Sequence, residues 1–343
     1  MLCGKMVSML KSKGVDPSKP EVFARQSYLA LLEPKYKKVM IIQHRLMCYL
    51  RERLASYGFI ELLPPMISTA SDPGLRGASK LTTKLYGYRY ELTSSTIMFK
   101  QIAASSLTKI FFMARNVREE PPENLYTGRH LAEFTQLDVE WAEADMDDVM
   151  RLVEDIVYYA WIKTIEESYN ILKEFRKEFP SMRPPFRKIT YDEALSLARE
   201  LGYKVADGKE LPQEAEEALS REFKEPFWIT NFPTSSRGFY YLETFDGSGR
   251  NRDFNLILPE GFGELVDGGE RDYRYGQIKE RIKALGEDLS KYEWFMEALK
   301  DGIVKPSAGF GLGIERFTRF VLGLKYIWEA VPFPKPPGIA PTP

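Results

Sequence analysis

The segment EFTQLDVE, residues 133–140, carries more structural information than any other part of the sequence. Successive side chains of a β-strand point to opposite faces, so Thr135, Leu137 and Val139 are predicted to face a hydrophobic core. The other face then holds one ring, one amide and two carboxyl groups, from Phe134, Gln136, Asp138 and Glu140. This combination indicates the floor of a ligand site, although an exposed strand with one stray ring would show the same alternation.

A neighbouring strand is predicted at residues 110–119, IFFMARNVRE, followed by a polar, turn-rich segment. The same alternation places Asn116, Arg118 and Glu120 on one face at the end of this strand. An arginine in that position would offer a phosphate several donors in a planar fork. The alternative is a surface ion pair, which is the commoner use of such a residue.

The rest of the chain switches irregularly between helical and strand patterns. Helices are predicted at residues 36–57 and 146–175, within a charged insertion at 176–225, and across 273–300. Strands are predicted at FIELLPPM, PFWITNF, FYYLETF and FNLILPEG. Strands that do not alternate regularly with helices favour an α+β fold with an antiparallel sheet flanked by helices over a doubly wound fold.

Composition excludes several classes of protein. The two cysteines, Cys3 and Cys48, and the two histidines, His44 and His130, are too few for a disulfide framework or a zinc site, so a metal would need oxygen ligands. The net charge is −1 and the isoelectric point about 6.3, so no overall charge attracts nucleic acid. No apolar run reaches membrane-spanning length, and a cytoplasmic enzyme without a membrane partner is expected.

Near the end of the chain, Gly309, Gly311 and Gly313 alternate just before a predicted helix that carries Arg316. Glycines on one face of a strand allow a ligand or another backbone to approach closely. The pattern lacks the spacing of a dinucleotide fingerprint. Arg316 could stack on a base or reach phosphates from the start of the helix.

Three separated stretches together resemble the catalytic core of class II aminoacyl-tRNA synthetases. VREE at 117–120 with RHLAEFTQLDVE at 129–140 is similar to motif 2, and GFGLGIERF at 309–317 is similar to motif 3. The helix that ends in GFIELLPP, with Pro65, is similar to motif 1. The resemblance covers roughly residues 36–340 and implies the antiparallel sheet of that class, with a helical insertion.

Within the class, EFTQLDVE, FKQ at 99–101 and GGER at 268–271 resemble the aspartyl/asparaginyl branch. The resemblance implies that ATP is bound by Arg118, Glu120, Arg129, His130, Phe134, Glu264 and Arg316, with Phe134 and Arg316 sandwiching the adenine. It implies that aspartate is bound by Ser95, Lys100, Gln136, Asp138 and Arg271. Arg118, Lys100 and Arg271 are the implied catalytic residues, and Glu264 with Asn255 would hold Mg²⁺.

Lys100 and Arg271 also have a physical argument behind them. A pocket that selects aspartate needs positive charge that is not cancelled, because desolvating a carboxylate without partners costs several kcal/mol. Asn255 departs from the family, which has an aspartate there, and an amide is a weaker ligand for a hard cation. Asp253 is a nearby carboxylate that could compensate.

Residues 1–35 are predicted to be a loosely docked arm, residues 36–343 the catalytic domain, and no anticodon-binding domain is expected. A core of this kind resembles the archaeal asparagine synthetases related to asparaginyl-tRNA synthetase. The resemblance implies an aspartate–ammonia ligase that forms AMP, with tRNA not expected as a partner. Two alternatives stay open: aspartyl or asparaginyl transfer to tRNA or a small acceptor, and a silent paralogue that only binds aspartate or ATP.

The resemblance also implies a two-fold homodimer through the motif 1 helix and strand. The apolar stripe from Val39 to Leu54 is consistent with such an interface. Packing of the stripe on the chain's own sheet is the alternative.

Overall fold

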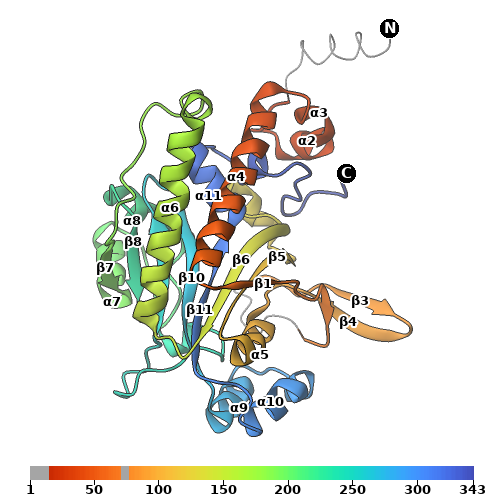
Figure 1. Ribbon diagram of the computed structural model, residues 1–343, viewed down its shortest axis with the longest axis vertical. Coiled ribbons are helices and arrows are strands. Elements are labelled where there is room, and N and C mark those ends of the chain that lie inside the picture. The colour runs from red at the N-terminus through yellow and green to blue at the C-terminus, as the bar shows by residue number, and fades with distance from the viewer. Residues whose placement is uncertain (1–14, 71–76) are drawn as a thin grey trace.

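An eight-stranded sheet forms the centre of the computed structural model, which describes residues 15–70 and 77–343 (Figure 1). Its strands lie in the order β1-β5-β6-β11-β10-β9-β8-β7, and the two outermost pairs, β1–β5 and β7–β8, are parallel while the others are antiparallel. The strands are β1 (Ile60–Leu62), β5 (Lys109–Val117), β6 (Glu133–Ala142), β7 (Arg187–Thr190), β8 (Phe227–Thr230), β9 (Asp253–Leu258), β10 (Gly263–Arg271) and β11 (Ser307–Gly313). The predicted α+β fold is confirmed.

The β6 strand has the two faces that its sequence predicts. Leu137 and Val139 are 0% and 1% exposed and belong to the main hydrophobic core. This core also contains the inner faces of the two long helices α4 (Pro34–Ser56) and α6 (Met146–Leu172). The polar face of β6 therefore points away from these helices.

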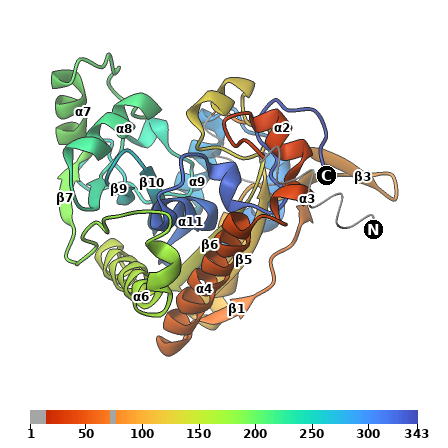
Figure 2. The ribbon, with the colours of Figure 1, turned by 90° about the horizontal axis from the view of Figure 1, so that it is seen from above.

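The α4 and α6 helices lie side by side against one face of the sheet, with α11 (Ile314–Leu322) beside them (Figure 2). The apolar stripe of α4 is buried within the chain itself, since Val39, Ile42, Leu50 and Leu54 are each fully enclosed. Burial of each such side chain stabilises the fold by about 1.5–3 kcal/mol. The stripe therefore stabilises the chain's own core, and it gives no support to a dimer interface.

The segment before α4 packs more closely than the predicted arm. It contains two short helices, α2 (Pro20–Arg25) and α3 (Ser27–Ala30). Phe23 is 1% exposed and its ring lies edge-on to Tyr36, while Trp328 donates to the carbonyl of Pro17. From residue 15 onward the segment docks on the catalytic domain, and the remainder of the predicted arm lies outside the described residues.

The insertion is also more integrated than predicted. After a loop, β7 joins the edge of the central sheet beside β8, and α7 (Tyr191–Glu200) and α8 (Gln213–Glu222) follow. Its small core packs directly on β8 and β9. The segment FYYLETF is not a regular strand; it makes only isolated bridges, at Tyr241 and Glu243. Its rings instead enter a second core under α9 (Tyr275–Ala284) and α10 (Glu293–Lys300).

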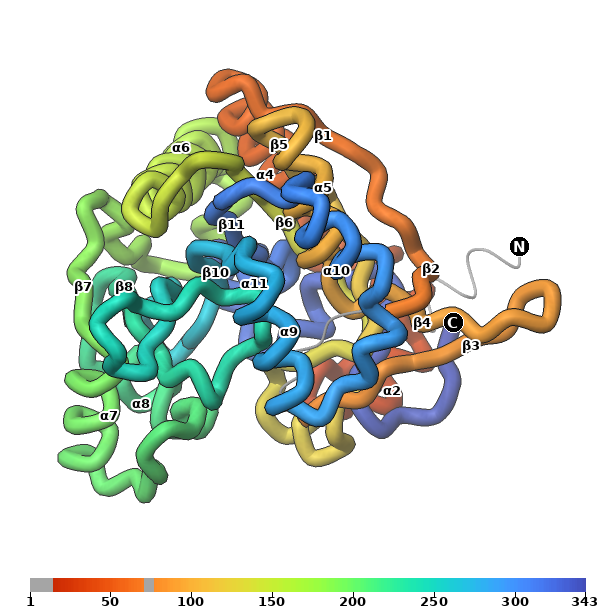
Figure 3. Tube along the Cα trace, turned by 90° about the horizontal axis from the view of Figure 1, so that it is seen from below, coloured from red at the N-terminus to blue at the C-terminus, as the bar shows by residue number. Residues whose placement is uncertain are grey.

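A three-stranded sheet lies beside the main one and consists of β2 (Ile67–Ser68), β3 (Thr82–Leu85) and β4 (Tyr88–Leu92). The β3–β4 hairpin extends well beyond the body of the molecule (Figures 1 and 3). β4 leads into α5 (Ile97–Leu107), which packs on β5 and β6. Within the described ranges, no helix has the length and apolar character needed to cross a membrane.

Candidate active site

A cavity of about 410 Å³ lies over the polar face of β6, on the side of the sheet away from α4 and α6. It brings together residues from the β4–α5 and β5–β6 connections, from β6, β10, β11 and α11, and from the insertion. Every predicted site residue except Asn255 contributes to its wall: Ser95, Lys100, Arg118, Glu120, Arg129, His130, Phe134, Gln136, Asp138, Glu264, Arg271 and Arg316. Motifs 2 and 3 therefore meet at one place, while the role of each residue stays a prediction.

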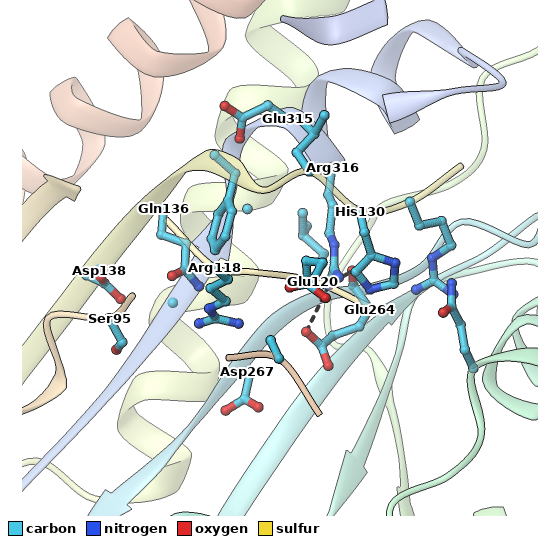
Figure 4. Close-up of a pocket in the computed structure, with 18 of the residues that line it drawn as sticks. Ser95, Arg118, Glu120, His130, Gln136, Asp138, Glu264, Asp267, Glu315 and Arg316 are labelled. Atoms are coloured by element: carbon cyan, nitrogen blue, oxygen red, sulfur yellow. Dashed lines mark hydrogen bonds and ion pairs between the residues drawn. The ribbon is translucent and has the colours of Figure 1, made fainter. Parts of the chain in front are cut away.

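The cavity has two ends (Figure 4). Ser95 and Asp138 lie at one end, and His130 and Arg316 lie at the other. Arg118 lies between them, where its guanidinium donates to the carbonyl of Ser94 and covers the Phe134 ring at 5.1 Å.

The alternating glycines of β11 make room for the polar side chains of β6. A Cβ atom on Gly309 would lie 2.1 Å from a carboxylate oxygen of Glu140, and one on Gly311 would lie 2.8 Å from the amide nitrogen of Gln136. Because real Cβ atoms essentially never approach so closely, larger residues here would displace Glu140 and Gln136. The alternating glycines were predicted to allow a close approach, and here they allow the side chains of β6 to pack closely against β11.

Four buried ionic side chains, Lys100, Asp138, Glu140 and Arg271, form a charge cluster at the Ser95 end. The Lys100 Nζ lies 3.5 Å from Asp138 and 3.6 Å from Glu140, and it donates to the carbonyl of Phe310 at 2.9 Å. The Arg271 Nε donates to Glu140 at 3.1 Å. Two cations are thus matched by two carboxylates, so the positive charge predicted for this pocket is balanced within the chain.

One hydrogen-bond donor of the charge cluster has no protein acceptor. Glu140 accepts from Nε and Nη2 of Arg271, but Nη1 is buried without a partner. Burial works against the charged guanidinium, yet the nearby Glu140 and Tyr241 raise the Arg271 pKa above its usual value. Burial lowers the pKa of Lys100, although Asp138 acts in the opposite direction. A buried donor of this kind needs an acceptor oxygen from a ligand or water.

The other end of the cavity is rich in arginine. Arg129 is 4% exposed; its Nη2 donates to Glu216 of α8 at 2.8 Å, and its Nε and Nη1 have no hydrogen-bond partner. Burial, reinforced by Arg316, Arg129 and Arg118, lowers the pKa of His130 to about 3. His130 is therefore neutral at physiological pH. Partnerless guanidinium nitrogens in such surroundings suit an anion with several oxygens, such as a phosphate chain.

Glu264 and Asn255 are not arranged as a pair of metal ligands. The Asn255 Oδ1 accepts from Arg237 at 3.0 Å, and its Nδ2 donates to Glu264 at 2.9 Å. Arginine can only donate and a carboxylate only accept, so these partners fix the orientation of the amide. Arg316 donates to the other carboxylate oxygen of Glu264 at 2.9 Å. In this geometry Asn255 presents its NH₂ group and not its oxygen to Glu264, so the Glu264 carboxylate is the oxygen ligand that this pair offers, and the Mg²⁺ site stays a prediction.

Several polar residues of the cavity wall were not predicted from the sequence: Glu210, Glu216, Tyr240, Tyr241 and Asp267. Two of them come from the insertion, which was predicted to lie outside the core. The tyrosines come from the segment that was predicted to be a strand. A partial signal was available in the doubled tyrosine next to a buried arginine, Arg237, which pairs with Asp267 at 2.7 Å.

The sheet and its motif-lined cavity define a ligase core of the class II aminoacyl-tRNA synthetase type. The chain belongs to the family of class II tRNA synthetases (D, K and N), and the family match extends over residues 19–337. It is therefore an enzyme of the ligase type.

Individual relatives agree with this assignment. The chain is 31% identical to an asparagine–tRNA ligase of Pyrococcus abyssi over 326 residues, which are 94% of this chain and 74% of the relative. It is 31% identical to an aspartate–tRNA(Asp/Asn) ligase of Sulfurisphaera tokodaii over 313 residues, 91% of this chain and 71% of the relative. The structure of Pyrococcus horikoshii asparaginyl-tRNA synthetase with asparaginyl-adenylate superposes with a TM-score of 0.89 at 29% identity, covering 96% of this chain and 76% of that one.

These comparisons support the aspartyl/asparaginyl branch, leave one more specific prediction without support and correct another. They give no support to an asparagine synthetase that uses ammonia, because the relatives are named as ligases of tRNA. The prediction that tRNA is not a partner is wrong for the same reason. It depended on the expected lack of an anticodon-binding domain and on the net charge of −1, a sum over the whole chain that says nothing about local surfaces.

Proposed function

We propose that the chain activates aspartate with ATP and transfers the aspartyl group to tRNA. The α-carboxylate of the amino acid attacks the α-phosphorus of ATP, and pyrophosphate leaves to give aspartyl-adenylate. A ribose hydroxyl at the 3′ end of tRNA then attacks the carbonyl carbon, losing its proton as AMP departs. Orientation of the reactants and neutralisation of developing charge supply the catalysis, so no nucleophilic side chain is required.

The observation that carries this proposal is the buried, partnerless Nη1 of Arg271 beside Lys100 in the charge cluster. Both groups are donors only, so a carboxylate side chain offers acceptor oxygens to both of them. Asparagine would turn its amide NH₂ toward one donor, leaving two donors facing each other. The aspartate side chain is therefore the better match, and Glu140 keeps Arg271 in place to receive it.

The remaining residues of the cavity would either bind the nucleotide or orient the amino acid. The Phe134 ring offers a surface for the adenine, and Arg118 beside it supports charge neutralisation at the α-phosphate. Arg129, with two free donors, suits the terminal phosphates. Asp138 accepts from Thr96 at 2.7 Å and lines the cavity, which supports a role in binding the α-ammonium group of the substrate.

Asparagine is the second candidate substrate. The charge cluster has no net formal charge, so a neutral side chain does not disturb its balance. Two of the relatives above are named for asparagine.

The test measures charging of tRNA transcripts with radiolabelled aspartate and asparagine in parallel. Amino-acid-dependent exchange of pyrophosphate into ATP is measured beside it, since this reaction needs no RNA. The proposal predicts aspartate-dependent exchange and aspartyl-tRNA. Exchange that depends only on asparagine would replace aspartate by asparagine, and exchange without any charged tRNA would refute the transfer step.

A further inference from the structure

The β3–β4 hairpin combines exposed aromatic rings with exposed cations. Tyr86 is 94% exposed and Tyr88 is 71% exposed, and Lys84 and Arg89 are exposed as well. No acidic residue occurs from Leu81 to Tyr90, although the chain as a whole carries a net charge of −1. The hairpin is thus a local basic and aromatic element on a molecule without overall positive charge.

The two cations occupy an unfavourable arrangement. Lys84 and Arg89 lie directly opposite each other in the antiparallel pair β3–β4. Like charges at facing positions repel and destabilise a hairpin. Neither has an acidic side chain within ion-pair distance among the residues that the structure describes. A bound polyanion would relieve this repulsion.

The turn of the hairpin contains a bulky residue, Tyr86, at a position that usually holds glycine or asparagine. Tyr86 has φ of 53° and Gly87 has φ of 85°, the left-handed values of a tight two-residue turn. Glycine or asparagine adopts this conformation readily, whereas a bulky residue there is strained. The ring at this position contributes nothing to the core, because it is almost completely exposed.

The position of the hairpin relates it to the cavity. Ala78 and Ser95, which lie just before and just after the two strands, both line the cavity. Four residue steps from Leu92 to Tyr88 carry the hairpin about 14 Å outward from that point. A strand of RNA whose 3′ end enters the cavity would therefore come within reach of the hairpin.

We infer that the β3–β4 hairpin is a docking element for single-stranded RNA, and that its occupant is the 3′-terminal strand of tRNA. This inference rests on the proposed function and names the surface that guides the RNA acceptor. Bases stack on Tyr86 and Tyr88, since every base presents a π-face, and Lys84 and Arg89 bind phosphates. Repulsion between the cations then falls when the RNA is bound.

Two double variants test the two halves of the surface, Tyr86→Ala/Tyr88→Ala and Lys84→Ala/Arg89→Ala. Tyr169→Ala removes a half-exposed ring from α6 and is the matched control. Affinity for a fluorescent tRNA transcript is measured over a range of salt concentrations, together with aspartate-dependent pyrophosphate exchange. Sedimentation reports the oligomeric state of each variant.

The tyrosine variant is expected to raise the Kd for tRNA about tenfold, the effect of losing one good stacking contact. The lysine–arginine variant is expected to lower the slope of log Kd against log salt by about 2, one for each phosphate contact. Pyrophosphate exchange stays within about twofold of wild type in both, and the control is unchanged. Tyr86→Phe/Tyr88→Phe retains tRNA affinity, because the stacking faces remain.

Unchanged tRNA affinity and salt slope in both double variants would overturn the inference while leaving the proposed function intact. A change in oligomeric state with unchanged tRNA affinity would instead assign the hairpin to contact with a second copy of the chain. A wild-type chain that binds no tRNA at all would reject both the hairpin and the transfer step.

Discussion

In the charge cluster, each buried cation is held by a carboxylate that determines where its remaining hydrogens point. Glu140 engages Nε and Nη2 of Arg271, which leaves Nη1 without an acceptor from the protein. Asp138 and the carbonyl of Phe310 hold Lys100 in the same way. Removing one partner of such a buried set leaves an uncompensated charge and costs about 3–5 kcal/mol.

Arg271→Gln is therefore expected to raise the KM for aspartate about 100-fold, since a charged hydrogen bond to the substrate is lost. The KM for ATP should change little, because Arg271 lies at the amino-acid end of the cavity. The measurement is aspartate-dependent pyrophosphate exchange at varied substrate concentrations.

Arg271→Gln also removes the main hydrogen-bond partner of Glu140, so an effect on the stability of the fold must be controlled for. Glu140→Gln/Arg271→Gln removes both charges and should recover part of the lost free energy of unfolding, with the aspartate KM still high. Recovery of normal aspartate KM in the double variant would show that Arg271 acts only by supporting the fold.

His130 should make stability depend on pH. Its pKa is lowered from 6.5 to about 3 in the folded chain, so below pH 6.5 the unfolded chain takes up a proton that the folded chain does not. The contribution to stability is complete above pH 6.5 and falls with decreasing pH by up to about 1.4 kcal/mol per pH unit. His130→Gln should flatten the unfolding free energy between pH 6 and 4, measured by urea denaturation, and an equally steep curve would contradict this.

Asn255 should limit binding of divalent cations, because its NH₂ group faces Glu264 where a second carboxylate would be needed. Asn255→Asp is expected to tighten Mn²⁺ binding without nucleotide by about tenfold or more, measured by paramagnetic resonance of the free ion. Adding Glu264→Gln should abolish the gain. Unchanged Mn²⁺ affinity in Asn255→Asp would mean that this position is not part of a cation site.

At the scale of elements, α8 of the insertion supplies an internal anion to the nucleotide end. The Glu216 Oε1 accepts from Arg129 and from the backbone nitrogen of Glu264. Burial opposes ionisation of Glu216, but Arg129 outweighs it and lowers the Glu216 pKa. The carboxylate thus stays charged and competes with a phosphate for Arg129.

Glu216→Gln keeps an acceptor oxygen but removes the charge. ATP affinity is expected to rise about fivefold, because the Glu216 carboxylate no longer repels the phosphates. The free energy of unfolding is expected to fall, because Arg129 loses its counter-charge. The neighbouring Glu217→Gln, whose partner Arg221 is exposed, is the matched control. Calorimetric titration with ATP and thermal melting measure the two effects, and weaker ATP binding would contradict competition.

The strands could be predicted from sequence where one rule decides their geometry. Alternation along β6 placed Leu137 and Asp138 on opposite faces because the period of a strand is two. FYYLETF is rich in residues that favour strands but is not a regular strand in the structure, since the packing of Tyr240 and Tyr241 under α9 overrides local propensity. Nothing in the sequence around Glu216 indicated that it lines the cavity, because α8 is distant in sequence from the motifs that line the rest of the cavity.

At the scale of the whole molecule, neither the apolar pattern of a helix nor the net charge tells where the residues concerned lie in the fold. The apolar stripe of α4 fits an external interface and an internal core equally well in sequence, and its packing against α6 and α11 shows that it belongs to the core. Net charge likewise averages over the surface, so it cannot reveal the cations of the β3–β4 hairpin. The family assignment is confirmed by a match over residues 19–337, and motifs 2 and 3, which lie far apart in the chain, line one cavity.

We propose that Arg271 and Lys100 together receive the side-chain carboxylate of an aspartyl group. A crystal structure with the stable adenylate analogue aspartyl-sulfamoyl-adenosine would show whether they do. We expect carboxylate oxygens of the aspartyl side chain within about 3.2 Å of both Arg271 Nη1 and Lys100 Nζ, with the adenine beside Phe134. An aspartyl side chain directed elsewhere, with Arg271 Nη1 bound only to water, would refute this assignment.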